Sequence, residues 1–340
     1  PASGNLSYSE TTTSSISCNA DGLQYVVESK NSDIATVELQ YRTLYVTAGQ
    51  ITGSTEITVT TIEDMIYNSV SASYKVTVSP NAIGSVSSEG YNGVYDGQPH
   101  SITVTCDGTT ITYAEVEGGP YSVTNPAYVN AGVYTVYYKV EKDGYDTFTG
   151  SEVVNITKAP GKITLSKVNG VFMNFGETQT TYITENASGA ALSVINSNSA
   201  VASVEITGNQ MLVTSGTATG GTIITIYSPE TTNYTSATAT YTATTVSVQG
   251  YTGVYDGQPH GVTVSCNGRQ IYYVINTQTN ATSTVSPTFT NAGNYTVKFI
   301  IYGDDGYPYV EDYVPVTIHK APLTITISPD NGTLTIPSSQ

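Results

Sequence analysis

Apolar and polar residues alternate in short stretches along the whole chain, and Gly, Asn, Asp and Ser separate these stretches. A period of two places every second side chain on one face, which is typical of a β-strand with one buried face. In the first half of the chain we predict such strands at residues 14–18, 25–28, 35–39, 44–47, 57–61, 72–78, 100–105, 110–114, 133–140 and 152–157. The pattern therefore predicts an all-β protein.

The chain is built from two types of module that alternate. Gly90–His100 recurs as Gly250–His260 with a single difference, and a fainter repeat relates Asn31–Leu39 to Asn198–Ile206. Repeats of this kind define the units of a modular protein. The order A-B-A-B predicts a first A module at 1–80, a first B module at 81–158, a second A module at 159–246 and a second B module at 247–320, followed at 321–340 by an extra strand or the start of a further A module.

Each module has the strand content of a small sandwich. About seven short strands with turns between them are the signature of an immunoglobulin-like fold. Asp96-Gly97 and Asp256-Gly257 suit tight turns, because Gly tolerates a positive φ and an Asp side chain bonds to the backbone two residues on. We therefore expect four tandem immunoglobulin-like β-sandwich domains in an elongated rod, with a C-terminal extra strand.

Both module types resemble domains of bacterial surface proteins. Through Ser32–Val37, Leu44–Gly49 and Thr55–Val59, the A modules resemble group-two immunoglobulin-like domains of the invasin type. Through Tyr95–Pro99 and Tyr255–Pro259, the B modules resemble MBG domains, a glycine-rich and mostly-β family. These resemblances imply an extracellular, cell-surface location and a spacing or adhesive role, with no catalytic residues to carry over.

Charge and motif content exclude several functions. The chain has 11 Lys and Arg against 27 Asp and Glu, and a net charge of −16 repels phosphate backbones and anionic lipid headgroups. No run approaches the roughly 18 apolar residues that cross a bilayer. His100 and His260 are repeat equivalents, and no metal, nucleophile or phosphate-loop motif is present. We expect no enzyme, no catalytic, cofactor or metal residues, no nucleic-acid partner and no direct membrane insertion.

Two features leave a ligand open. Asp304-Asp305 with Glu311-Asp312, and Asp143 with Asp146 in the first copy, place carboxylates in a hairpin-like loop where calcium could bind, although no full calcium-loop signature is present. The chain has 28 Tyr and no Trp. Most of these rings should cover cores and neighbouring strands, but exposed Tyr rings of the B modules could contact glycans.

The ends of the repeat suggest how copies join. Lys158–Lys167 opens the second A module, and the first A module has no counterpart of it, whereas Lys320–Pro329 repeats the same pattern at the end of the chain. A module without its first strand exposes unpaired strand edges, so we expect the tail of one copy to complete the first A module of the next. The donor face is assigned to Leu323, Ile325 and Ile327, and the acceptor groove to Leu6, Tyr8 and Ile16.

Two interpretations follow from these ends. A tail that pairs with the next copy makes a heterologous, open-ended contact and hence a homopolymeric filament. Alternatively, the 340 residues are excised from a longer tandem array, and the partners are neighbouring domains of a longer surface protein. Both describe an extracellular structural subunit of a cell-surface fibre or adhesin stalk. The alternative function is a glycan- or host-binding adhesin module.

Overall fold

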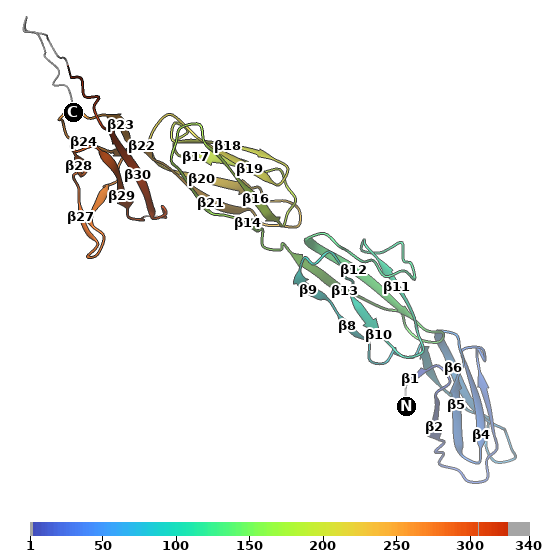
Figure 1. Ribbon diagram of the computed structural model, residues 1–340. Coiled ribbons are helices and arrows are strands. Elements are labelled where there is room, and N and C mark those ends of the chain that lie inside the picture. Colours follow the sequence, from blue (N-terminus) through green and yellow to red (C-terminus); the bar gives the residue numbers. More distant parts are fainter. Residues whose placement is uncertain (1–2, 305, 326–340) are drawn as a thin grey trace, which may run out of the picture. The chain divides into compact units, whose positions relative to one another are not determined.

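The computed structural model describes residues 3–304 and 306–325, and within these ranges the fold is all-β, without helices. The chain divides into two compact units, Pro1–Lys158 and Ala159–Gln340. Figure 1 colours the strands of the first unit from blue to green and those of the second from yellow-green to red. In the described part of the chain no helix is long and apolar enough to cross a membrane.

The first A module consists of two sheets. One sheet has the order β1-β7-β6-β3, with β1 parallel to β7, and the other has the order β2-β5-β4. Their inner faces share a core that includes Leu6, Val46, Ile57 and Val76. The strands are β1 (Ser3–Ser7), β2 (Thr11–Ser15), β3 (Tyr25–Ser29), β4 (Ala35–Gln40), β5 (Thr43–Ala48), β6 (Gly53–Thr61) and β7 (Ser71–Ser79).

The first B module packs a two-stranded sheet, β10-β8, over a four-stranded sheet, β11-β12-β13-β9. Ile102 and Val104 share a core cluster with Val136 and Val154, which lie on the larger sheet. The strands are β8 (Ser87–Glu89), β9 (Tyr91–Val94), β10 (Thr103–Thr105), β11 (Thr110–Ala114), β12 (Gly132–Glu141) and β13 (Phe148–Thr157).

The second A module has the same plan with one additional strand. Its sheets have the orders β14-β16-β19-β18 and β15-β21-β20-β17, and β15 runs parallel to β21 as β1 does to β7. The strands are β14 (Ile163–Leu165), β15 (Asn169–Phe172), β16 (Thr178–Asn186), β17 (Ser193–Asn196), β18 (Ala202–Thr207), β19 (Gln210–Ser215), β20 (Gly220–Ser228) and β21 (Ala237–Thr245).

The second B module repeats the first with longer edges. A five-stranded sheet, β23-β30-β29-β26-β27, accompanies the pairs β22-β25 and β24-β28. The strands are β22 (Ser247–Gln249), β23 (Tyr251–Val254), β24 (His260–Gly261), β25 (Thr263–Ser265), β26 (Tyr272–Asn276), β27 (Ala281–Ser283), β28 (Thr288–Phe289), β29 (Gly293–Ile301) and β30 (Val310–His319).

The all-β sandwich fold predicted from the alternation is confirmed. The division between the two compact units falls after Lys158, and the predicted limits of the four modules stay predictions. Each module has its own core cluster. Within the predicted C-terminal strand, residues 321–325 are not in a strand and residues 326–340 lie outside the described part.

Candidate functional site

Strand β14 closes one edge of the second A module. It pairs antiparallel with the end of β16, with Thr164 opposite Glu185 and Leu165 opposite Ile183. Its two apolar side chains, Ile163 and Leu165, are each only 9% exposed and belong to the core of the module. The strand therefore supplies both backbone hydrogen bonds and apolar side chains to this edge.

Within the described residues, the matching edge of the first A module is unpaired. Strand β2 ends at Ser15, four residues before the point that corresponds to the end of β16, and no strand of the described residues pairs with Ile16–Asn19. A groove of about 340 Å³ lies at this place. Its lining includes Ile16 and Cys18, which correspond to the residues that β14 contacts in the second A module.

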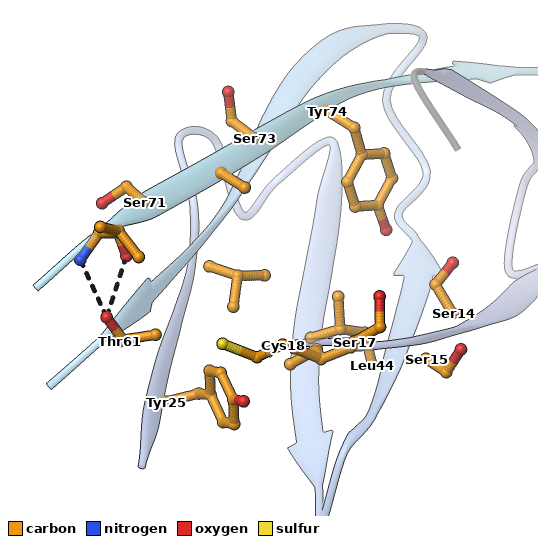
Figure 2. Close-up of a pocket in the computed structure, with 14 residues that line it drawn as sticks. Ser14, Ser15, Ser17, Cys18, Tyr25, Leu44, Thr61, Ser71, Ser73 and Tyr74 are labelled. Atoms are coloured by element: carbon orange, nitrogen blue, oxygen red, sulfur yellow. Dashed lines mark hydrogen bonds between the residues drawn. The ribbon is translucent and has the colours of Figure 1, made fainter. Parts of the chain in front are cut away.

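Side chains from several strands line the groove, as Figure 2 shows. Tyr74 and Ser73 extend from β7 on one side, and Tyr25 and Cys18 lie on the other. The full lining is Ser14, Ser15, Ile16, Ser17, Cys18, Tyr25, Leu44, Val59, Thr61, Val70, Ser71, Ala72, Ser73 and Tyr74. This mixture of apolar and hydroxyl side chains suits an extended segment with one apolar face.

Two tyrosine hydroxyls of the groove have no hydrogen-bond partner within the described residues, those of Tyr25 and Tyr74. Burial raises the pKa of Tyr74, and the nearby Ser14 hydroxyl opposes part of that rise without forming a well-shaped hydrogen bond. A buried hydroxyl without a partner is costly.

The tyrosine at the corresponding position of the second module is placed differently. Tyr241 is 2% exposed, and a Cβ built on Gly170 would lie 2.1 Å from its hydroxyl oxygen. In the first module a Cβ on Gly4 meets nothing within 4 Å, while the Tyr74 hydroxyl points toward Ser14. Side chains therefore pack closely against Gly170 of β15, whereas the space next to Gly4 of β1 is empty.

Of the three predicted acceptor residues, only Ile16 lines the groove. Leu6 is a core residue of β1 and lies opposite Val78 of β7. Tyr8 lies next to the first B module, with its hydroxyl 2.7 Å from the Thr52 hydroxyl. The apolar pattern did not predict β1. Leu6 lies in this strand and Tyr8 directly follows it, and neither lines the groove.

The repeat register near β1 also needs a correction. Phe172 lies opposite Thr245, the repeat equivalent of the residue opposite Leu6. Leu6 therefore corresponds to Phe172. The separation of 167 positions between Asn31–Leu39 and Asn198–Ile206 would place Leu6 one position later, at Met173. Gly4 and Gly170 become equivalents as a result.

The predicted donor residues are accessible where the structure describes them. Leu323 is 88% exposed and Ile325 is 78% exposed, and Ile327 lies outside the described residues. Aligned on Lys-Ala-Pro, Ile325 and Ile327 take the places of Ile163 and Leu165. These isoleucines therefore match the two buried residues of β14.

Leu323 takes the place of Gly161, where a Cβ would lie 2.1 Å from the carbonyl oxygen of Thr235. In the first A module the residue equivalent to Thr235 is Asn68. For Leu323 to fit there, the Asn68 backbone must lie further from the docked tail than the Thr235 backbone lies from Gly161.

The acidic loops of the B modules form joints with the preceding A modules. Asp304 makes an ion pair of 2.7 Å with Arg269, and the guanidinium lies 5.4 Å from the ring centre of Tyr307. Gly306 accepts a hydrogen bond from Thr242 of the A module. Asp305 lies outside the described residues.

Two further carboxylates expected at a calcium site, those of Glu311 and Asp312, have partners within the protein. Glu311 pairs with Lys298 at 3.0 Å and accepts from the Tyr309 hydroxyl, while Asp312 caps the Tyr313 amide. In the first unit, the Asn81 amide donates to the Gly144 carbonyl at 3.0 Å at the equivalent joint. The described residues contain no group of three or more acidic, His or Cys side chains that could hold a metal.

The repeated motif of the B modules is a braced turn. Gly97 has a φ of +79°, Asp96 accepts a hydrogen bond from the Gln98 amide, and His100 Nε2 lies 2.9 Å from the same carboxylate oxygen. The His100 ring stacks on Tyr91 with ring centres 3.8 Å apart. The second copy has the same contacts, which explains the motif by structure alone.

Comparisons with known proteins give similarity at the level of fold. No family model matches the chain, and no curated protein sequence matches it. Among solved structures, the protocadherin gamma B4 extracellular domain is 12% identical with a TM-score of 0.30, covering all of this chain and 70% of that chain. The human desmocollin-1 ectodomain is 10% identical with a TM-score of 0.31, covering 95% and 79%. The insect immune protein hemolin is 11% identical with a TM-score of 0.23, covering 94% and 98%.

The fold defines a protein of tandem immunoglobulin-like β-sandwich modules. The resemblance of the A modules to invasin-type domains and of the B modules to MBG domains stays a prediction, since no family model matches.

Proposed function

We propose that the protein is an extracellular structural subunit of a surface fibre, and that residues 320–329 of one copy complete the first A module of the next. The observation that carries this proposal is the groove at Ile16–Asn19, which occupies the place that β14 fills in the second A module.

Sequence and chemistry favour this tail as the occupant. Lys320-Ala321-Pro322 repeats the start of the segment that leads into β14, and isoleucines follow at the positions of its two buried residues. The side chain of Ile325 is exposed, and so it is available to a second copy. A donor at one end and an acceptor at the other generate a filament, because the contact does not close on itself.

The extracellular location is supported by the resemblance of both module types to surface-protein domains. A chain of small sandwiches with few charges and many Thr and Tyr residues on strands is suited to a stalk, because each module adds length without needing a site of its own.

Negative-stain microscopy of the purified chain at micromolar concentration tests assembly directly. We expect long filaments from the full chain and none from a chain that lacks Lys320–Gln340. A variant with Ile325→Asp and Ile327→Asp keeps the length of the tail and should also lose the filaments. Filaments that survive both changes would contradict the proposal.

A second candidate, glycan binding, is favoured by two exposed tyrosines of the second B module, Tyr302 and Tyr309, which lie near the half-buried Tyr272. The ring centres of Tyr272 and Tyr302 are 5.3 Å apart, and those of Tyr302 and Tyr309 are 6.1 Å apart. The Lys298–Glu311 ion pair lies beside them, with Tyr309 bonded to Glu311. Such rings combine an apolar face with a polar edge, which suits a sugar.

A glycan array probed with the full chain tests this second function. Binding that is lost in the Tyr302→Ala, Tyr309→Ala double variant would support it. The matched control is Tyr41→Ala, which removes a fully exposed ring of the first A module. No signal on the array, or a signal that both variants keep, would argue against a site at these tyrosines.

A further inference from the structure

The second A module holds the segment before β14 at a separate point, the turn Thr231–Tyr234. Ala159 is bridged to Tyr234: its amide donates to the Asn233 carbonyl at 2.9 Å, and its carbonyl accepts from the Thr235 amide at 3.0 Å. Ala159 is 9% exposed. Two backbone hydrogen bonds therefore hold Ala159 against this turn before the chain enters the sheet as β14.

The first A module has the same turn at Asp64–Tyr67. The Asp64 amide donates to the Tyr67 carbonyl at 3.1 Å, as the Thr231 amide does to Tyr234 at 2.9 Å. The Asp64 carboxylate also accepts from the amides of Ile66 and Tyr67, where the second module uses the Thr231 hydroxyl. The two turns are equivalent in sequence position and in hydrogen bonding.

The turn of the first module differs in being uncovered. Every residue from 62 to 70 is exposed, including the large apolar side chains of Met65, Ile66 and Val70, whereas Asn233 and Tyr234 are half-buried. In the described part of the chain neither the Ile66 carbonyl nor the Asn68 amide takes part in a backbone hydrogen bond outside the sheets. Val70, three residues after the turn, lines the groove, whereas no residue of the turn itself does.

We propose that the turn Asp64–Tyr67 is a second docking point for the neighbouring copy, and that it binds Ala321 as the turn Thr231–Tyr234 binds Ala159. The occupant is the Lys320-Ala321-Pro322 segment, which repeats the sequence around Ala159. The Ala321 amide would donate to the Ile66 carbonyl, and the Asn68 amide would donate to the Ala321 carbonyl. This proposal rests on the proposed assembly and adds a contact that the groove does not include.

Engineered disulfides in the full chain separate the two contacts, in a background of Cys106→Ala and Cys266→Ala. Thr326→Cys probes the groove. In the second A module Thr164 lies opposite Glu185, and the equivalents of these residues are Thr326 and Cys18, so the new cysteine should form a disulfide with Cys18 of the next copy. With Cys18→Ala added, Tyr67→Cys and Ala321→Cys probe the turn. Paired strand residues have Cα atoms within the range that a disulfide spans.

The control for the turn is Met65→Cys with Ala321→Cys, since Met65 corresponds to Thr232, which does not pair with Ala159. On non-reducing gels we expect covalent ladders from the groove variant and from the turn variant. The Met65→Cys, Ala321→Cys control should give no ladder. A groove ladder without a turn ladder would overturn the second docking point and leave the assembly intact. Absence of both ladders together with absence of filaments would overturn both.

Hydrogen exchange tests the same contact in the protein without any substitution. The Asn68 amide should be protected in filaments and exchange freely in the chain without Lys320–Gln340. Unchanged exchange at Asn68 alongside new protection at Ile16–Asn19 would overturn the second docking point while supporting the groove.

Discussion

The two A modules share a strand order and differ at one edge, and the difference shows what a strand needs. The polar strand β16 runs for nine residues where β14 lies beside it, while β2 runs for five where no strand of the described residues does. Ile183 is buried, and its equivalent Ile16 is half-buried. The same stretch of sequence becomes a strand only as far as it has a partner.

The two B modules make the opposite comparison. Their Asp-Gly turns, their stacked Tyr and His rings and their Asp–His contacts agree within about 0.1 Å in ring separation and distance. These turns agree although the A modules that precede them differ at one edge. The difference between the A modules is therefore local to one edge strand and is not a general divergence of the repeats.

The largest expected effect comes from giving the first A module its own strand. A chain with residues 320–329 fused ahead of Pro1 should stabilise this module, because burying two isoleucines contributes about 1.5–3 kcal/mol each. The same fusion should stop filament growth by filling the groove. Denaturant unfolding and electron microscopy measure the two effects. Filaments of normal length from the fused chain would contradict the view that the groove of the first A module accepts the tail of another copy.

Removing the apolar anchor of β14 should make the second A module resemble the first. Leu165→Ala deletes a buried core side chain, and such changes cost about 2–5 kcal/mol. Hydrogen exchange should then speed up at residues 183–186 while the second B module is unaffected. An unchanged rate at these amides would mean that β14 does not hold the edge of β16.

A matched glycine pair tests the packing under β15 and β1. Gly170→Ala places a methyl group against Tyr241 and should cost about 1–3 kcal/mol, as overpacking does. Gly4→Ala meets open space and should change stability by less than about 0.5 kcal/mol. Thermal melting of both variants measures the contrast. Equal costs would contradict the difference between the two tyrosines.

The smallest expected effect is a pH dependence that both B modules share. Hydrogen bonds from the Gln98 amide and from His100 lower the pKa of Asp96, and Asp256 has the same partners with the same direction. A lowered pKa contributes stability above the unfolded value, about 3.9, and that stability is lost as the pH falls through the folded pKa.

The double variant Asp96→Asn, Asp256→Asn should therefore lose less melting temperature than the unmodified protein when the pH falls from about 6 to about 3. These two values lie about 2 units above and about 1 unit below the pKa of an ordinary Asp. Differential scanning fluorimetry measures the melting temperatures. An identical loss would mean that these carboxylates do not control acid stability. A loss that one of the single variants alone relieves would show that the two turns are not equivalent.

The strands with strict alternation could be predicted from the sequence, and β11 (Thr110–Ala114) has the predicted bounds. Strand β1 was missed because Ser-Gly-Asn-Leu-Ser has a single apolar residue, and it forms by pairing with β7. The open edge could be predicted from the repeat. The role of the turn Asp64–Tyr67 could not, because it depends on carbonyl and amide directions that side-chain patterns do not carry.

The most direct test adds a peptide of residues 320–340 to a chain that ends at His319 and follows hydrogen exchange at Ile16–Asn19. The account predicts saturable protection of these amides, and no protection from a peptide with Ile325→Asp and Ile327→Asp. Exchange at Ile16–Asn19 that the unmodified peptide leaves unchanged at saturating concentration would contradict the claim that this groove accepts the tail of a second copy.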